Sequence, residues 1–300
     1  MKLAVSVLAL LLSLPFPVFA VTVSDSRGPQ DFAKPPERVI VLSWELVEQV
    51  LQLDITPVAI ADSKGYRTWV VRPHLPDGVD DVGTRQEPNL EKIAELRPDL
   101  ILASDEQNAF VAKLEAIAPV LHFDAFKEDH NNYLASREIY KVLARLFGRE
   151  ELAQRRLDDL DQRLSALKVK LSDHFQGKLP KVTPARFIDG SRVRVHGANS
   201  MAQYALEALG IENGFPQAPS TWGFALRKIE ELSQAKDGYV IHIEPFPQAE
   251  NVFSTQLWAF MPFVKGGRFT SIPSTWTFGG PFSVGLLAEA FADALMKAKP

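Results

Sequence analysis

The chain has 300 residues, a formal net charge of −4 and no cysteine, and 46% of its residues are hydrophobic. This composition excludes a disordered chain, and the lack of cysteine excludes disulfide bonds. The mild acidity and the lack of a basic stripe argue against nucleic acid as a partner. The length exceeds the usual size of a single hydrophobic core, so two lobes are expected.

Residues 1–20 have the organisation of an export signal. Lys2 precedes a short apolar run, and Val18 and Ala20 stand at the positions that a signal peptidase reads. The run is interrupted by proline and is shorter than the ~20 apolar residues that a membrane-spanning helix needs. No cysteine is available for lipid attachment. We therefore expect cleavage near Ala20 and a soluble protein in a Gram-negative periplasm.

The first half of the chain alternates predicted strands and helices. Continuous apolar runs predict buried strands at 38–42, 57–61 and 99–103, separated by helices at 45–53 and 90–97. Such an alternation indicates a parallel sheet covered on both faces. The intervening stretch 66–88 is rich in turn residues and is predicted to be a loop. It carries Tyr66, Trp69 and Arg85, and aromatic and guanidinium groups on loops are suited to holding compact, partly polar ligands.

A similar pattern returns in the second half. It predicts strands at 187–189, 193–195 and 239–243 and helices at 200–209 and 226–232. The predicted helix at 226–232 can be overlaid on residues 90–96, and this weak duplication favours two similar lobes. Between the halves, five leucines at spacings of three and four form one apolar seam on a predicted long helix. These are Leu157, Leu160, Leu164, Leu167 and Leu171.

The predicted fold class is therefore α/β, with two lobes of mainly parallel sheet joined by one long rigid helix. We expect a first ligand-binding lobe at 21–148, an interlobe helix at 149–175 and a second ligand-binding lobe at 176–300. The leucine seam is shorter than a coiled-coil dimer usually needs, so a monomer is expected. A stiff bridge of this kind predicts a small closure of the lobes on binding.

The motifs bear on three kinds of chemistry. An enzyme is disfavoured because the sequence has no nucleophile elbow, P-loop, dinucleotide fingerprint or H-E-x-x-H motif. A divalent-metal receptor is a weaker alternative, since the six histidines are singly placed and only His74 and His196 lie on suitable loops. A receptor for an organic ligand is favoured by Trp69, Trp222 and Trp276, which lie near Gly- and Pro-rich loops.

Several motifs resemble those of periplasmic ferric hydroxamate siderophore-binding proteins, which belong to the binding proteins with a helical bridge. The motifs are Tyr66-Arg-Thr-Trp69, Asp81-Val-Gly-Thr-Arg85 followed by Glu87-Pro-Asn-Leu90, and the segment from Trp258 to Phe269. The resemblance extends from about Arg38 to about Phe291. It implies a receptor that delivers its ligand to an inner-membrane ABC permease driven by a cytoplasmic ATPase.

The resemblance also implies which residues contact the ligand. The expected contacts are Trp44, Tyr66, Trp69, Arg85 and Gln107 from the first lobe and Trp222, Phe224, Trp276 and Phe278 from the second. Gln107 stands where the family has a tyrosine, Phe278 replaces a second tyrosine, and Phe224 replaces a small hydroxylated residue. These departures leave the choice of siderophore open.

Three hydroxamates fill the six positions of Fe3+ and neutralise its charge, so no protein metal ligand and no cofactor is expected. A single guanidinium, that of Arg85, suits a neutral complex, whereas a trianionic catecholate complex needs several cations. A catecholate siderophore, haem and vitamin B12 remain alternative ligands. Glu95 and Glu231 occupy equivalent positions in the repeated unit and are candidate contacts to permease arginines.

Overall fold

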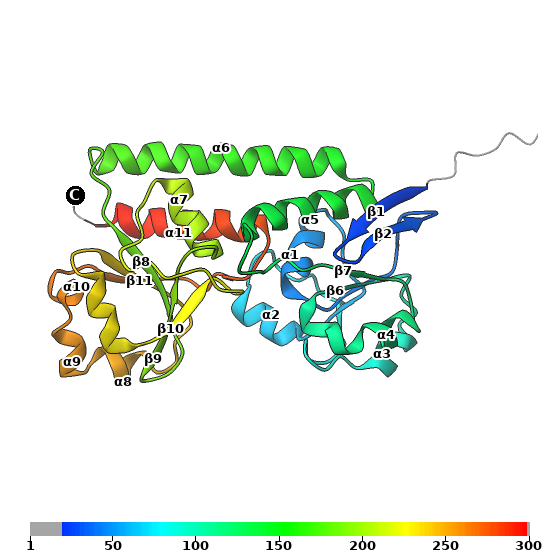
Figure 1. Ribbon diagram of the computed structural model, residues 1–300, viewed down its shortest axis with the longest axis horizontal. Helices are drawn as coiled ribbons and strands as arrows, with labels where there is room; N and C mark the ends of the chain where they lie inside the picture. Colours follow the sequence, from blue (N-terminus) through cyan, green and yellow to red (C-terminus); the bar gives the residue numbers. More distant parts are fainter. Residues whose placement is uncertain (1–19, 299–300) are drawn as a thin grey trace, which may run out of the picture.

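The computed structural model describes residues 20–298, so almost all of the expected export signal at 1–20 lies outside the described residues. Two α/β lobes lie side by side along the long axis, and one long helix runs over both (Figure 1). The predicted fold class is confirmed. The first lobe begins with a hairpin of β1 (Val21–Asp25) and β2 (Gly28–Phe32).

The first lobe contains a parallel sheet of five strands in the order β5-β4-β3-β6-β7. Its strands are β3 (Val39–Val41), β4 (Ala59–Ile60), β5 (Asp80–Asp81), β6 (Leu100–Ala103) and β7 (Val120–His122). The helices between them are α1 (Trp44–Leu51), α2 (Ser63–Trp69), α3 (Leu90–Glu95), the 3-10 helix η1 (Asp105–Phe110) and α4 (Val111–Glu115). The strands β3 and β6 are fully buried, as their continuous apolar sequences predict.

The second lobe contains a mixed sheet in the order β10-β9-β8-β11-β12. Its strands are β8 (Val182–Phe187), β9 (Arg192–His196), β10 (Phe224–Lys228), β11 (Tyr239–Ile243) and β12 (Phe269–Ile272). Its helices are α7 (Met201–Leu209), η2 (Ile229–Ala235), α8 (Ala249–Phe253), α9 (Gln256–Ala259), α10 (Pro262–Lys265) and α11 (Pro281–Met296). The strands β8, β11 and β12 are parallel, whereas β9 and β10 are antiparallel to their neighbours.

The helix α6 (Glu150–His174) follows α5 (Asn132–Leu146) and lies above both lobes in Figure 1. Four of the five predicted seam leucines are buried, and Leu167 is half-buried. The helix packs on α5, α7 and α11. The approach to α11 is close, because a Cβ at Gly285 would lie 2.5 Å from Leu160. One continuous hydrophobic core therefore extends through both lobes beneath α6.

Polar contacts also join the lobes. Glu48 of α1 accepts hydrogen bonds from the backbone of Gly280 and from Ser283. The Ser274 hydroxyl donates to the carbonyl of Trp69 at 3.0 Å, and the Asn132 amide donates to the carbonyl of Asn199 at 2.8 Å. The two lobes are thus tied at several points around the space between them.

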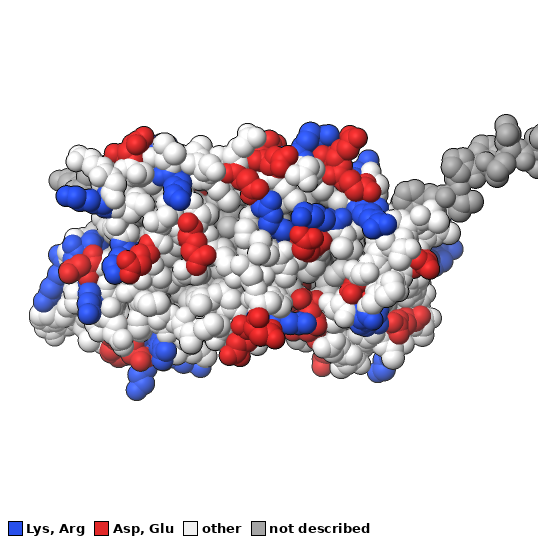
Figure 2. Space-filling view, turned by 45° about the horizontal axis from the view of Figure 1, so that its top comes forward, with Lys and Arg blue, Asp and Glu red and all other residues white. Residues whose placement is uncertain are grey.

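Charged side chains of both signs are interspersed over the face shown in Figure 2. Ion pairs connect neighbouring helices: Arg137 of α5 pairs with Asp161 of α6, and Arg163 of α6 pairs with Glu289 of α11. Within residues 20–298, no helix is both long and apolar enough to cross a membrane.

Three local predictions were wrong. The strand expected at 187–189 overlaps β8 only at Phe187, where β8 ends. Tyr66 to Trp69 are not in a loop but in α2, which begins at Ser63. The preceding Asp62 caps this helix, because its side chain accepts a hydrogen bond from the Gly65 backbone. The segment 226–232 is not one helix: residues to Lys228 belong to β10 and pair with β9, and Ile229 begins the 3-10 helix η2. The apolar–charged sequence of this segment fits an edge strand as well as a helix, and pairing with β9 decided the outcome.

Candidate functional site

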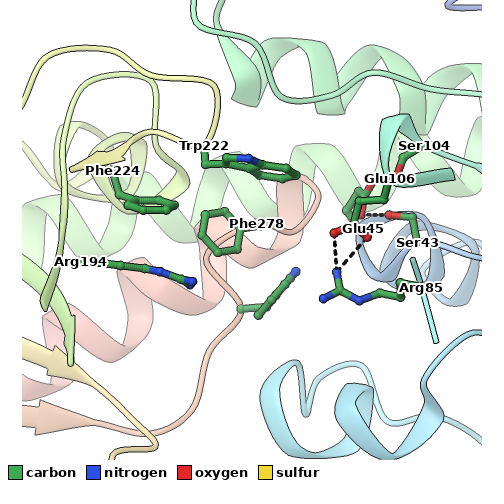
Figure 3. Close-up of a pocket in the computed structure, with 10 residues that line it drawn as sticks. Ser43, Glu45, Arg85, Ser104, Glu106, Arg194, Trp222, Phe224 and Phe278 are labelled. Carbon is green, nitrogen blue, oxygen red and sulfur yellow. Dashed lines mark hydrogen bonds and ion pairs between the residues drawn. The ribbon is translucent and has the colours of Figure 1, made fainter. Parts of the chain in front are cut away.

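Two adjoining cavities lie between the lobes. The first cavity, of about 320 Å3, is lined by Ser43, Glu45, Arg85, Ser104 and Glu106 of the first lobe and by Arg194, Trp222, Phe224, Trp276 and Phe278 of the second. Figure 3 shows these two walls facing each other. The second cavity, of about 390 Å3, is lined by Trp44, Asp62, Trp69, Arg85, Arg186, Phe187, Ile188, Arg194 and Trp276. The cavities share Arg85, Arg194 and Trp276, so one ligand can occupy both.

Arg85 lies in the turn that follows β5, and three contacts fix its position. Its Nη1 donates to both carboxylate oxygens of Glu106 at 3.1 Å, and its Cζ lies 3.9 Å from the centroid of the Trp44 ring. The buried Gln107 amide donates to the backbone carbonyl of Arg85 at 2.8 Å. The Nε of Arg85 is buried without a partner. In Figure 3 the guanidinium points into the first cavity, and its Nη2 has no bond within the described residues.

The second lobe supplies an aromatic wall. Phe278 lies 5.5 Å from Trp222, 5.8 Å from Phe224 and 5.2 Å from Trp276, measured between ring centroids. Trp276 also packs edge-to-face on Trp44 of the first lobe, with the two ring centroids 5.0 Å apart. These rings support one another, so the wall presents flat apolar faces in fixed orientations.

The first-lobe wall carries acidic groups that the sequence analysis missed. Burial raises the pKa of Glu45 to about 7, although the hydrogen bond from Ser43 opposes this change. Burial also raises the pKa of Glu106, and the charge of Arg85 opposes it. The capping pattern of Ser104 and Gln107 at the start of η1, which places Glu106, was a usable signal in the sequence.

The second-lobe wall carries two arginines that the sequence analysis also missed. Arg186 of β8 and Arg194 of β9 are direct partners in the antiparallel register. Together with Arg85 they bring three guanidiniums to the two cavities, so the expectation of a single arginine was wrong. Burial, followed by the charge of Arg194, lowers the pKa of Arg186 to about 10. Burial and both guanidiniums lower the pKa of the neighbouring His196 to about 3, which keeps its ring neutral.

Of the nine expected ligand contacts, seven line the cavities, and Trp44 and Trp69 do so in the second one. The structure does not bring Tyr66 or Gln107 to either cavity. Tyr66 is fully buried, and its hydroxyl donates to the carbonyl of Pro73. Gln107 is fully buried and bonds the backbone of Ser104 and Arg85.

The two candidate docking residues are not equivalent in the structure. Glu95 is the exposed last residue of α3. Glu231 lies in the 3-10 helix η2, where its carboxylate accepts a hydrogen bond from the backbone of Lys228. The structural equivalence that the apparent repeat suggested is therefore wrong.

The arrangement of the cavities suits binding. Within the described part of the chain, no three His, Asp or Glu side chains are grouped as metal ligands. The first cavity offers guanidinium donors on two sides and aromatic faces between them. This combination can hold a compact ligand with electron-rich oxygens and an apolar body.

Comparisons with known proteins agree on one family. Residues 39–275 match the family described as periplasmic binding protein. The iron(3+)-hydroxamate-binding protein FhuD of Escherichia coli strain K12 is 32% identical over 250 residues, which cover 83% of each chain. The Fe(3+) dicitrate-binding periplasmic protein FecB of the same strain is 32% identical over 198 residues, 64% of this chain and 62% of FecB. A crystal structure is known of the siderophore-binding protein FhuD from Vibrio cholerae with bound Fe3+-Desferal. That chain is 42% identical in sequence and superposes with a TM-score of 0.86, and the match covers 88% of this chain and 99% of the other.

Proposed function

This chain belongs to the periplasmic binding protein family, and from that premise we propose that it captures ferric hydroxamate siderophores and delivers them to an inner-membrane ABC permease for iron uptake. The observation that carries the proposal is the interlobe cavity, in which Arg85 of one lobe faces an aromatic wall of the other. The sequence and structural likenesses to two FhuD proteins support the ligand class.

The chemistry of the ligand fits this cavity. In a ferric trihydroxamate the iron is fully coordinated and its charge is neutralised, so the complex presents hydroxamate oxygens on one side and an apolar backbone on the other. Arg85 lines the cavity, and its side chain is bonded within the described residues through Nη1 only, so its Nη2 can donate to those oxygens. Trp222, Trp276 and Phe278 offer rigid faces to the apolar part. Iron thus enters as a pre-formed complex, and the protein itself uses no cofactor.

The proposed cellular location also rests on the similarity to known proteins. FecB of Escherichia coli is a periplasmic protein, and the expected export signal at residues 1–20 supports a protein that acts in the periplasm. We propose that it acts there as a monomer. The protein binds its ligand and releases it to the permease without converting it. Mass spectrometry of an iron-loaded siderophore after incubation with the protein tests this, and a new product would contradict it.

Docking to the permease is assigned to acidic residues on the two lobes. Glu95 is free to meet a permease arginine, whereas Glu231 would first have to give up its bond to the Lys228 backbone. Charge reversal at Glu95 should therefore impair transport more than charge reversal at Glu231. Normal transport by the double variant, with ligand binding intact, would remove both residues from docking.

A fluorescence titration tests the ligand class. The tryptophans at the cavities should be quenched by iron-loaded ferrichrome and ferrioxamine B at lower concentrations than by a ferric catecholate, haem or cobalamin. Iron-free forms of the same siderophores serve as the matched control. Tighter binding of the catecholate, haem or cobalamin than of every hydroxamate would overturn the proposed class.

A further inference from the structure

Arg186 and Arg194 form a pair of like charges on neighbouring strands. The register of β8 and β9 sets them directly opposite each other, and both line the second cavity. Like charges in this position destabilise a sheet. Two uncharged residues at these positions would give a more stable fold. Stability therefore does not explain why both positions are arginine.

Neither guanidinium has a carboxylate partner among residues 20–298. Arg186 is only 3% exposed, and although its Nη2 donates to the carbonyl of Thr275 at 2.7 Å, its Nε and Nη1 are buried without partners. Arg194 has a buried, unpartnered Nε, and its Cζ lies 4.8 Å from the Phe224 ring. In Figure 3 its guanidinium points across the first cavity toward that of Arg85.

The nearest acids are engaged elsewhere. Glu244 accepts a hydrogen bond from the backbone of Phe246 and lies 3.6 Å from His242. Asp62, which lines the second cavity, caps α2 through the backbone of Gly65. The buried donors of Arg186 therefore lack the charged partner that a buried cation requires.

We propose that Arg186 and Arg194 form an anion subsite that binds a free carboxylate carried by a ferric hydroxamate complex. This inference rests on the proposed function and names a preferred group within its ligand class, the ferric hydroxamate complexes that carry a free carboxylate. The iron-bearing part occupies the first cavity, and the carboxylate reaches the second one past Arg85 and Trp276, which line both. The bound carboxylate supplies the missing hydrogen-bond acceptor and offsets the repulsion between the two arginines.

The surroundings favour a carboxylate that is part of the chelate over a free inorganic anion. Trp69 lies 5.5 Å from the Cζ of Arg186, and Trp44, Trp69 and Trp276 give the second cavity apolar walls. A small hydrated ion gains nothing from such walls, whereas an organic arm buries its carbon atoms against them. The arm also remains joined to the body held in the first cavity, which raises its effective concentration at the arginines.

Titrations with three iron complexes of different charge test the subsite. The probes are ferrichrome, which is neutral, ferrioxamine B, which carries an ammonium group, and ferric aerobactin, whose citrate hydroxyl and carboxylate help to coordinate the iron and whose two N-hydroxylysine arms carry free carboxylates. In Arg186→Met, which changes the second cavity alone, the affinity for ferric aerobactin should fall roughly tenfold or more, while that for the other two complexes changes by less than about threefold. In Arg194→Met, which changes both cavities, the loss for ferric aerobactin should exceed the loss for the other two complexes by roughly tenfold. Arg192→Met is the matched control, because Arg192 lies on the same strand but is exposed and paired with Asp189.

Thermal unfolding completes the experiment. The Arg194→Met protein should melt at the wild-type temperature or above it, because the change removes a partly buried, unpaired charge. A lower melting temperature with unchanged selectivity would make the arginines structural and overturn the subsite. Equal losses for all three complexes, or binding of iron-free citrate as tight as that of ferric aerobactin, would overturn it as well. If wild-type protein binds none of the three complexes, the proposed function itself fails; binding of ferrichrome alone would contradict only the subsite.

Discussion

Glu48 and Ser283, which belong to different lobes, form a buried hydrogen-bonded pair. The carboxylate accepts the Ser283 backbone N–H at 2.8 Å and the Ser283 hydroxyl at 2.5 Å, and Gly280 adds a third donor. These groups form the N-terminus of α11, where a negative charge is favoured. The contact joins the first lobe to the start of the helix that packs along α6, so it helps to fix how the lobes are placed.

Stability should depend on pH through Glu48. Burial raises the pKa of its carboxyl group to about 7 in the folded protein, above the ordinary value of 4.5, despite the donors around it. The folded state therefore holds this proton more tightly than the unfolded chain. The stabilising contribution is fully present below about pH 4.5 and is lost as the pH rises through about 7.

The variant Glu48→Gln cannot titrate at this position. The free energy of unfolding of this variant minus that of the wild type should grow as the pH rises from about 4.5 to about 7.5. The total change in this difference should be up to about 3 kcal/mol. Urea unfolding at several pH values measures this difference. Glu45 and His196 also titrate, but they are present in both proteins and cancel in the comparison. Parallel pH profiles for the two proteins would contradict the raised pKa.

Arg85→Ala should weaken the binding of ferric hydroxamates and leave the fold intact. The side chain is half-buried at the cavity wall, and its loss removes charge-assisted hydrogen bonds to the ligand oxygens. Such bonds are worth about 1.5–3 kcal/mol, so affinity should fall roughly ten- to a hundredfold. Fluorescence titration with ferrichrome measures the loss. The exposed Arg145 of α5 provides the control Arg145→Ala, and equal affinities of the two variants would remove Arg85 from the site.

Gln107 should act by positioning Arg85. Its amide bonds the Arg85 carbonyl and the Ser104 N–H, and it does not line either cavity. Gln107→Met leaves these groups without partners and should lower the free energy of unfolding by about 1–3 kcal/mol. Hydrogen exchange at residues 83–88 should become faster. The exposed neighbour gives the control Gln86→Met. A loss of affinity with unchanged stability and exchange would instead indicate direct contact with the ligand.

Much of the fold could be predicted because its strongest patterns are local. The leucine seam predicted the helix that became α6, and the apolar runs predicted the central strands β3, β6 and β11. The edge strand β10 was missed because half-exposed residues such as Leu226 and Arg227 carry no decisive period. Its state depends on pairing with β9, a contact between segments about thirty residues apart in sequence.

The site was predictable in its aromatic half and less so in its charged half. Trp222 and Trp276 stand in Gly- and Pro-rich loops, which marked them as candidates, and Phe278 followed from the family resemblance. Arg186 and Arg194 lie within strands and meet only through the antiparallel register of β8 and β9. The alternation of charged and apolar residues in β9 was a usable signal for Arg194. Arg186 follows a buried run without such alternation, so its role depends on tertiary structure.

Ligand binding should change the shape of the molecule very little. A continuous core passes through both lobes, and the contacts of Glu48, Ser274 and Asn132 tie them together, so wide opening would break buried hydrogen bonds and separate packed apolar groups. Small-angle scattering of the free protein and of the protein saturated with a ferric hydroxamate should give equal radii of gyration within error. The variant Ser283→Ala, which loses one tie, should bind with nearly unchanged affinity because the core remains. A clear compaction of the wild-type protein on loading would show that the free lobes stand further apart than this structure places them.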